Sequence, residues 1–158
     1  MVDALALVAH RSRRDVYAEL LPQIESLLSD ESDLIANQAN ISAVLNDAFG
    51  FHWTGFYRVQ NDELVLGPFQ GPVACTRIPK GKGVCGSAWQ QAATIVVPDV
   101  DQFPGHIACS ALSRSEIVVP YFDAAGAVAG VLDIDSSRLD EFSAEDQFWL
   151  EKITALLR

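Results

Sequence analysis

Residues 116–135 read EIVVPYFDAAGAVAGVLDID, two runs of β-branched and aromatic residues on either side of the small, polar stretch Asp123–Gly126. Runs of this kind with turn residues between them predict a β-hairpin. In the second run Asp133 and Asp135 are two residues apart, so their side chains point to one face of the strand. Leu132 and Ile134 point to the other face. The hairpin therefore predicts an antiparallel sheet with an apolar face and a locally acidic face.

The register of this hairpin decides what the acidic residues do. A turn of two or four residues would place Glu116 directly opposite Asp133, so that three carboxylates converge. Like charges facing each other across strands are destabilising and raise one pKa unless a cation lies between them. A turn of three or five residues would flip the register. Two interpretations stay open: a pocket for a small ammonium compound or a metal ion, and a solvated acidic surface.

Along the rest of the chain, the spacing of the apolar residues switches several times between the helical and the strand pattern. Apolar spacing predicts a helix over 13–28, kinked or restarted at Pro22, and a second helix capped by Ser32 or Asp33 and ended by Gly50. The remaining predicted elements are a hairpin of 52–59 and 63–69, a short helix over 84–91, a strand at 95–97, a loop with a helical turn over 99–113, and a closing helix after Ser143. This order is typical of one α+β domain over 13–158, a mostly antiparallel central sheet with helices packed on it. Residues 1–12 are expected to form a loosely held arm.

Composition excludes several classes of function. The chain has 158 residues, a net charge of −10 and a pI near 4.5, which argues against nucleic-acid binding. The sequence contains no apolar run of about 20 residues, the length that a membrane span needs. We also find no secretory signal, so we expect a cytoplasmic protein. The three cysteines are an odd number, which fits a compartment that keeps thiols reduced.

The three cysteines lie in the segment between the two hairpins, with the spacing Cys75-x9-Cys85-x23-Cys109. No C-x2-C pair and no paired histidine ligands occur, so we expect no metal and no cofactor. Cys75 and Cys109 lie in Gly- and Pro-rich or aperiodic segments, where thiols are accessible and can meet if a loop moves. Cys85 starts a helix, whose dipole would lower its pKa. Three buried structural thiols are the alternative.

Trp53 and Tyr57 are four residues apart on the first predicted strand and therefore share a face. They could form an aromatic wall against a methyl, thioether or cationic group, or they could be ordinary core residues. Thiols, carboxylates and aromatic rings together describe a pocket for an amino acid with an oxidisable sulfur.

Several short motifs resemble one known family, the free methionine-(R)-sulfoxide reductases, which have the GAF fold. The resemblance runs from about Val16 to the C-terminus. It includes Gly67-Pro68-Phe69-Gln70-Gly71, Ala74-Cys75, Gly83-Val84-Cys85-Gly86, Gly105-His106-Ile107-Ala108-Cys109, Ser115-Glu116-Ile117-Val118 and Gly130-Val131-Leu132-Asp133-Ile134-Asp135-Ser136. All three cysteines fall at the spacing of that family.

The resemblance implies a role for each candidate residue. Cys109 would attack the sulfoxide sulfur, release methionine and become a sulfenic acid, which Cys75 would resolve as a disulfide. Cys85 could contribute to this step, and thioredoxin would reduce the product. The substrate's amino group would bind to three carboxylates that also help to protonate the sulfoxide oxygen, and two rings would line the methyl pocket. These residues are Glu116, Asp133, Asp135, Trp53 and Tyr57.

The chain departs from the family pattern after Phe122, where the connection is one residue longer than expected. A β-bulge could absorb that residue and keep the register. A homodimer through the first and last helices is also implied. Two other functions stay open: a GAF-type sensor that binds a small molecule without chemistry, and a thiol peroxidase, which also forms a sulfenic acid.

Overall fold

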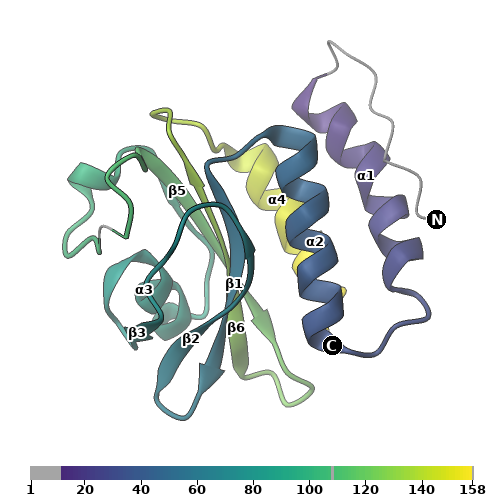
Figure 1. Cartoon of the computed structure of the whole chain (residues 1–158), viewed down its shortest axis with the longest axis horizontal. Coiled ribbons are helices and arrows are strands. Elements are labelled where there is room, and N and C mark those ends of the chain that lie inside the picture. Colours follow the sequence, from purple (N-terminus) through teal and green to yellow (C-terminus); the bar gives the residue numbers. More distant parts are fainter. Residues whose placement is uncertain (1–11, 108, 158) are drawn as a thin grey trace.

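A computed structural model describes residues 12–107 and 109–157 of the chain. Within these residues, six strands form a single sheet in the order β3-β2-β1-β6-β5-β4, in which neighbouring strands run antiparallel (Figure 1). The strands are β1 (Trp53–Gln60), β2 (Glu63–Gln70), β3 (Arg77–Pro79), β4 (Ile95–Val97), β5 (Ser115–Phe122) and β6 (Val128–Ser136). The α+β class and the antiparallel sheet predicted from the sequence are confirmed.

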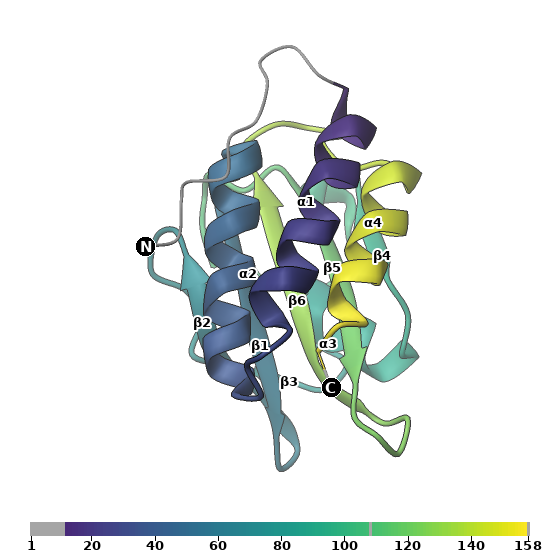
Figure 2. The same ribbon diagram turned by 90° about the vertical axis from the view of Figure 1, so that its right-hand side faces the viewer.

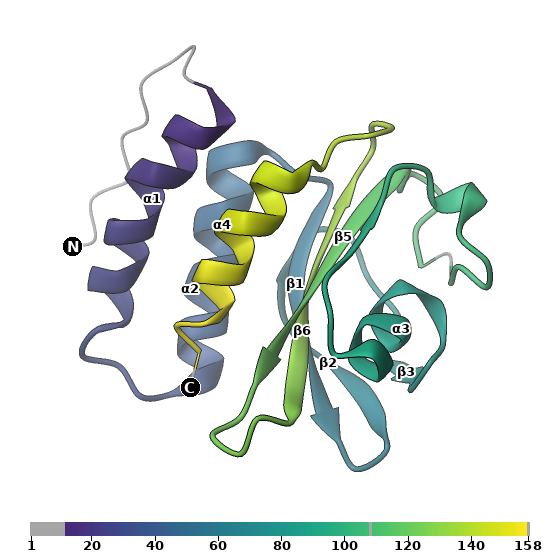
Figure 3. The same ribbon diagram turned by 180° about the vertical axis from the view of Figure 1, so that it is seen from behind.

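The helices are divided unequally between the two faces of the sheet. Helices α1 (Arg13–Leu28), α2 (Leu34–Phe49) and α4 (Ala144–Thr154) lie on one face, with α1 outermost (Figures 1 and 2). Helix α3 (Gly83–Gln91) and the short 3-10 helix η1 (Val100–Gln102) lie on the other side of the sheet (Figure 3). None of the helices in the described ranges is long and apolar enough to cross a membrane.

The helix ends follow the predicted capping. Asp33 accepts a hydrogen bond from the Ala36 N–H, and Gly50 ends α2 with a φ of 65°. Ser143 and Asp146 form a capping box at α4. The predicted restart at Pro22 is wrong, because α1 continues through Pro22 as a single helix. Of the predicted N-terminal arm, residues 1–11 lie outside the described ranges, whereas Ser12 caps α1 through the Asp15 N–H.

In the hairpin of β5 and β6, the acidic side chains stay on one face of the sheet although the turn is irregular. Phe122 pairs with Val128, so the connection has five residues, Asp123–Ala127, instead of four. Five residues alone would flip the register. The next pair, however, is Tyr121 with Gly130, so Ala129 is an extra residue in β6, and the parity is restored. The bulge foreseen for the longer connection is present.

Each face of the sheet has its own core. Leu132 and Ile134 of β6 contact the apolar residues of α1, α2 and α4, among them Tyr17, Leu20 and Ile41. Trp53, Tyr57, Val118 and Val131 point to the opposite face and pack with α3. This second core is smaller, and the acidic residues of the sheet lie on its side.

Candidate active site

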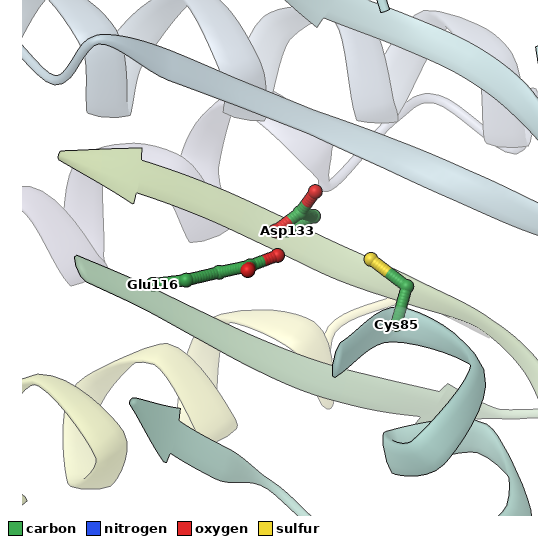
Figure 4. Close-up of side chains that lie close together, drawn as sticks. All are labelled: Cys85, Glu116 and Asp133. Atoms are coloured by element: carbon green, nitrogen blue, oxygen red, sulfur yellow. The ribbon is translucent and has the colours of Figure 1, made fainter. Parts of the chain in front are cut away.

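Three carboxylates meet on the α3 side of the sheet, as the sequence predicted, but in a different register. Glu116 of β5 pairs with Asp135 of β6, and Asp133 pairs with Val118. The predicted pairing of Glu116 with Asp133 is therefore wrong by two residues. Because the shift is even, all three side chains still share one face. In Figure 4, Glu116 and Asp133 extend from neighbouring strands toward the same space.

Burial controls the charge of these carboxylates. Glu116 and Asp133 are each 6% exposed. Burial, followed by the nearby Asp135 carboxylate, raises the pKa of Glu116 to about 8. Burial, followed by the Glu116 carboxylate, raises the pKa of Asp133 well above its usual range, and burial and Asp133 do the same to the pKa of Asp135. The cluster therefore retains protons at neutral pH.

One oxygen of the cluster has no partner. Asp133 Oδ1 is buried and accepts no hydrogen bond from the described residues. By contrast, Asp135 Oδ1 accepts one from the Ser113 hydroxyl at 3.0 Å. A buried acceptor without a donor is costly, so this position favours a ligand that brings a donor or a positive charge.

Two of the three cysteines are joined beside these carboxylates. Cys75 follows β2, Cys109 follows η1, and their sulfur atoms form a disulfide with a Cα–Cα distance of 5.6 Å. Cys109 is exposed, whereas Cys75 is half-buried against the core around α3. Two segments that are 34 residues apart in the chain are thus closed over one cavity.

Cys85 differs from what the sequence predicted. It does lie in the first turn of α3, but it is buried, and its thiol is free. Burial is the largest influence on its pKa, followed by the negative charges of Asp133 and Glu116, and together they raise that pKa well above its usual range. The expected lowering by the helix dipole is therefore wrong, because desolvation and three nearby carboxylates outweigh it.

Trp53 and Tyr57 share one face, as predicted, and they line the cavity while belonging to the core around α3. Their ring centroids are 6.0 Å apart, and Phe69 stacks on Trp53 at 5.2 Å. The polar end of each ring is already occupied, because Trp53 Nε1 donates to the Pro72 carbonyl and Tyr57 OH donates to the Cys75 carbonyl at 2.8 Å. The faces of the rings are therefore left as apolar wall, and Tyr57 also fixes the backbone of a cysteine.

All of the candidate residues except Cys75 line a single cavity. The space between its lining atoms is about 540 Å³ when open solvent is included, and about 40 Å³ of it can hold the centre of a water-sized sphere. Its lining includes Trp53, Tyr57, Cys85, Cys109, Glu116, Asp133 and Asp135. Cys75 lies at its edge through the disulfide and through its neighbour Ala74. The cavity combines a buried acidic floor, an aromatic wall and one sulfur of the disulfide.

Two residues of the site were not assigned a role from the sequence. His106 Nε2 lies 3.7 Å from Glu116 Oε2, and Ser113 donates to Asp135. His106 lies three residues before Cys109 in the same motif, and the motif alone gives the histidine no separate role. Ser113 lies in an aperiodic loop, where no periodicity indicates which way a side chain points.

The fold and the site together define a class of protein, a GAF domain with a disulfide beside an acidic pocket. The family model for the GAF domain matches residues 30–158. A curated relative named GAF domain-containing protein A, from Dictyostelium discoideum, is 55% identical over 151 residues, covering 95% of each chain.

Two further relatives have an enzyme name. The free methionine-R-sulfoxide reductase of Escherichia coli is 43% identical over 147 residues, covering 92% of this chain and 88% of its own length. The X-ray structure of the enzyme of that name from Neisseria meningitidis, in complex with its substrate, is 55% identical with a TM-score of 0.94. It covers 98% of this chain and 92% of its own chain. The chain belongs to the free methionine-R-sulfoxide reductase family.

Proposed function

We propose that this protein reduces free L-methionine-(R)-sulfoxide to L-methionine, using Cys109 as the nucleophile and thioredoxin as the reductant. The observation that carries the proposal is the Cys75–Cys109 disulfide at a cavity whose floor is acidic and buried. The relatives named free methionine-R-sulfoxide reductase support the same substrate.

The proposed binding mode follows from the floor and the wall of the cavity. The substrate's ammonium group donates to Asp133 Oδ1, which has no other described partner, and to the neighbouring carboxylates Glu116 and Asp135. The methyl group lies against Trp53 and Tyr57, whose polar ends are engaged elsewhere. This geometry selects a free amino acid, because a methionine inside a polypeptide has no ammonium group.

In the proposed chemical step, the Cys109 thiolate attacks the sulfoxide sulfur. The sulfoxide oxygen takes a proton from the carboxyl cluster, and Glu116, with its pKa near 8, holds one at neutral pH. The attack forms a bond between the Cys109 and methionine sulfurs. The protonated oxygen then moves from the methionine sulfur to the Cys109 sulfur as this S–S bond breaks, so methionine leaves and Cys109 carries the oxygen as a sulfenic acid. The Cys75 thiol then attacks that sulfur, water departs, and the disulfide forms. A dithiol reductant supplies two electrons and two protons to restore both thiols.

The surroundings of the disulfide suit a protein reductant. Cys109 is exposed, and the apolar side chains of Val73 and Leu112, a few residues from the two cysteines, are 88% and 66% exposed. An external thiolate can therefore approach Cys109 more easily than the half-buried Cys75. Cys85 is proposed as a secondary resolving thiol, because it is buried beneath the site. A cytoplasmic location, where thiols are kept reduced, is part of the same proposal.

The homodimer stays a prediction. Phe148 on α4 is 52% exposed and offers apolar surface on the helical side of the molecule. Light scattering coupled to size exclusion would measure the mass of the protein in solution.

The test is NADPH oxidation coupled through thioredoxin and its reductase, with the R and S epimers of free methionine sulfoxide assayed separately. We expect turnover with the R epimer only. A parallel assay with dithiothreitol and chromatographic detection of methionine separates failure of the enzyme from failure of the coupling. N-acetyl-methionine-(R)-sulfoxide, which has no ammonium group, should be a poor substrate. If neither epimer is consumed with either reductant, the proposal is wrong; consumption of peroxide instead would indicate a thiol peroxidase.

A further inference from the structure

A sulfur atom and two carboxylates form a compact group beneath the disulfide. Cys85 Sγ and one carboxylate oxygen each from Glu116 and Asp133 all lie within 4.8 Å of one another. Figure 4 shows the three side chains converging from α3, β5 and β6. Ligand spacing along the chain does not predict this group, because its residues come from separate elements that only the folded sheet brings together.

An independent observation points to a positively charged occupant. Asp133 is 94% buried, its Oδ1 has no partner among the described residues, and it faces the cavity that the other two residues also line. Cys85 is not consumed by the disulfide. The group is therefore both unsatisfied and reachable from solvent.

The geometry and the donor atoms suit zinc. Bonds of about 2.3 Å to sulfur and about 2.0–2.2 Å to oxygen place tetrahedral ligands roughly 3.3–3.7 Å apart. Because the three atoms lie within 4.8 Å of one another, they would have to approach by at most about 1.1–1.5 Å. Magnesium and calcium take oxygen ligands, whereas a thiolate favours zinc. Three protein ligands leave the fourth position of the ion open toward the cavity.

We propose that the protein binds one Zn²⁺ through Cys85, Glu116 and Asp133, and that the bound ion keeps the substrate out. The thiol proton, and any proton held by the Glu116 and Asp133 carboxyl groups, leaves to solvent as the three bonds to zinc form. Zinc binding itself does not depend on the proposed function. The exclusion of substrate does rest on it, because the ion would occupy the place proposed for the substrate's ammonium group.

Zinc binding is measured on the oxidised protein, in which Cys85 is the only free thiol. Titration against a chromophoric chelator should give one Zn²⁺ per chain. Cobalt should give a sulfur-to-cobalt charge-transfer band. Cys85→Ser should abolish this band and weaken zinc binding at least about 100-fold, since even changes behind the ligands cost roughly 10- to 100-fold. Asp133→Asn should weaken zinc binding as well.

The matched control is His52→Gln. His52 Nε2 contacts the Ser110 hydroxyl and not the cluster, so this variant should bind zinc like the unaltered protein. Circular dichroism checks that each variant is folded. Equal zinc affinity in Cys85→Ser and the unaltered protein, no thiolate band, or no stoichiometric binding would overturn the metal site.

Exclusion of substrate is measured without a reductant, on the double variant Cys75→Ser/Cys109→Ser, which cannot turn over. Methionine-(R)-sulfoxide should raise the apparent dissociation constant of zinc in proportion to its own concentration. Zinc bound but not displaced would overturn the exclusion and count against the proposed substrate site. No zinc bound, together with normal turnover by the unaltered enzyme, would overturn the metal site alone.

Discussion

Glu116→Gln tests whether the acidic face of the sheet lowers the stability of the folded protein. The pKa of Glu116 is about 8 in the folded protein, against 4.5 for the unperturbed group. A raised pKa means that the folded state binds this proton more tightly than the unfolded state. The resulting stabilisation is therefore complete below pH 4.5 and is lost as the pH rises toward 8. Glutamine has no proton to lose, so the variant should escape this loss.

The magnitude follows from the separation of the two pKa values. Each pH unit between them corresponds to about 1.4 kcal/mol. At 6% exposure, solvent screens this effect little. The free energy of unfolding of the variant, relative to the unaltered protein, should therefore rise by about 3 kcal/mol between pH 5 and pH 7.5. The neighbouring Asp133 and Asp135 titrate together with Glu116, so the observed pH midpoint belongs to the whole cluster.

The assay is urea unfolding of the oxidised protein, followed by tryptophan fluorescence at both pH values. Glu25→Gln, on the exposed surface of α1, controls for the loss of one carboxylate in general. A stability difference for Glu116→Gln that stays constant with pH, or one that turns against the variant at pH 7.5, would refute the view that burial holds the proton.

Four further results are expected. Activity should fall above about pH 8 as Glu116 loses the proton that the sulfoxide oxygen needs, which a pH profile of kcat/KM would reveal. Cys109→Ser should abolish turnover while Cys85→Ser retains much of it; equal loss in the coupled assay would remove support for Cys109 as the nucleophile. Asp133→Asn should raise KM and lower kcat together, whereas a change in KM alone would limit Asp133 to binding. Gly130→Ala should destabilise the fold by about 3 kcal/mol, because the added Cβ would lie 2.3 Å from both Tyr121 OH and the Tyr57 carbonyl; unchanged thermal unfolding would contradict that clash.

The sequence predicted what depends on periodicity. The alternation of Leu132, Asp133, Ile134 and Asp135 indicated two different faces, and the structure has both. The spacing of Trp53 and Tyr57 likewise placed both rings on one side. Helix ends were predictable wherever a side chain caps them, as Asp33 does.

What escaped prediction depends on tertiary context. To predict that Glu116 pairs with Asp135, one must know the length of the turn and the bulge at Ala129. The alternation of apolar and polar residues indicates neither. The pKa of Cys85 was predicted in the wrong direction, because its helix position is local whereas its burial against two strands is not. His106 and Ser113 reach the carboxylates from a loop. Its residues have no regular apolar spacing that would indicate which way a side chain points.

Strand β6 has a consequence for how such a protein can change over evolutionary time. Its even-numbered and odd-numbered positions have different functions. Leu132 and Ile134 pack against the helical layer, whereas Asp133 and Asp135 face the cavity. Replacing the two acids would remodel the pocket yet leave the helical layer intact. One architecture can therefore acquire or lose a chemistry through a few alternate positions, and a descendant that kept the pocket without its thiols would persist as a pure ligand receptor.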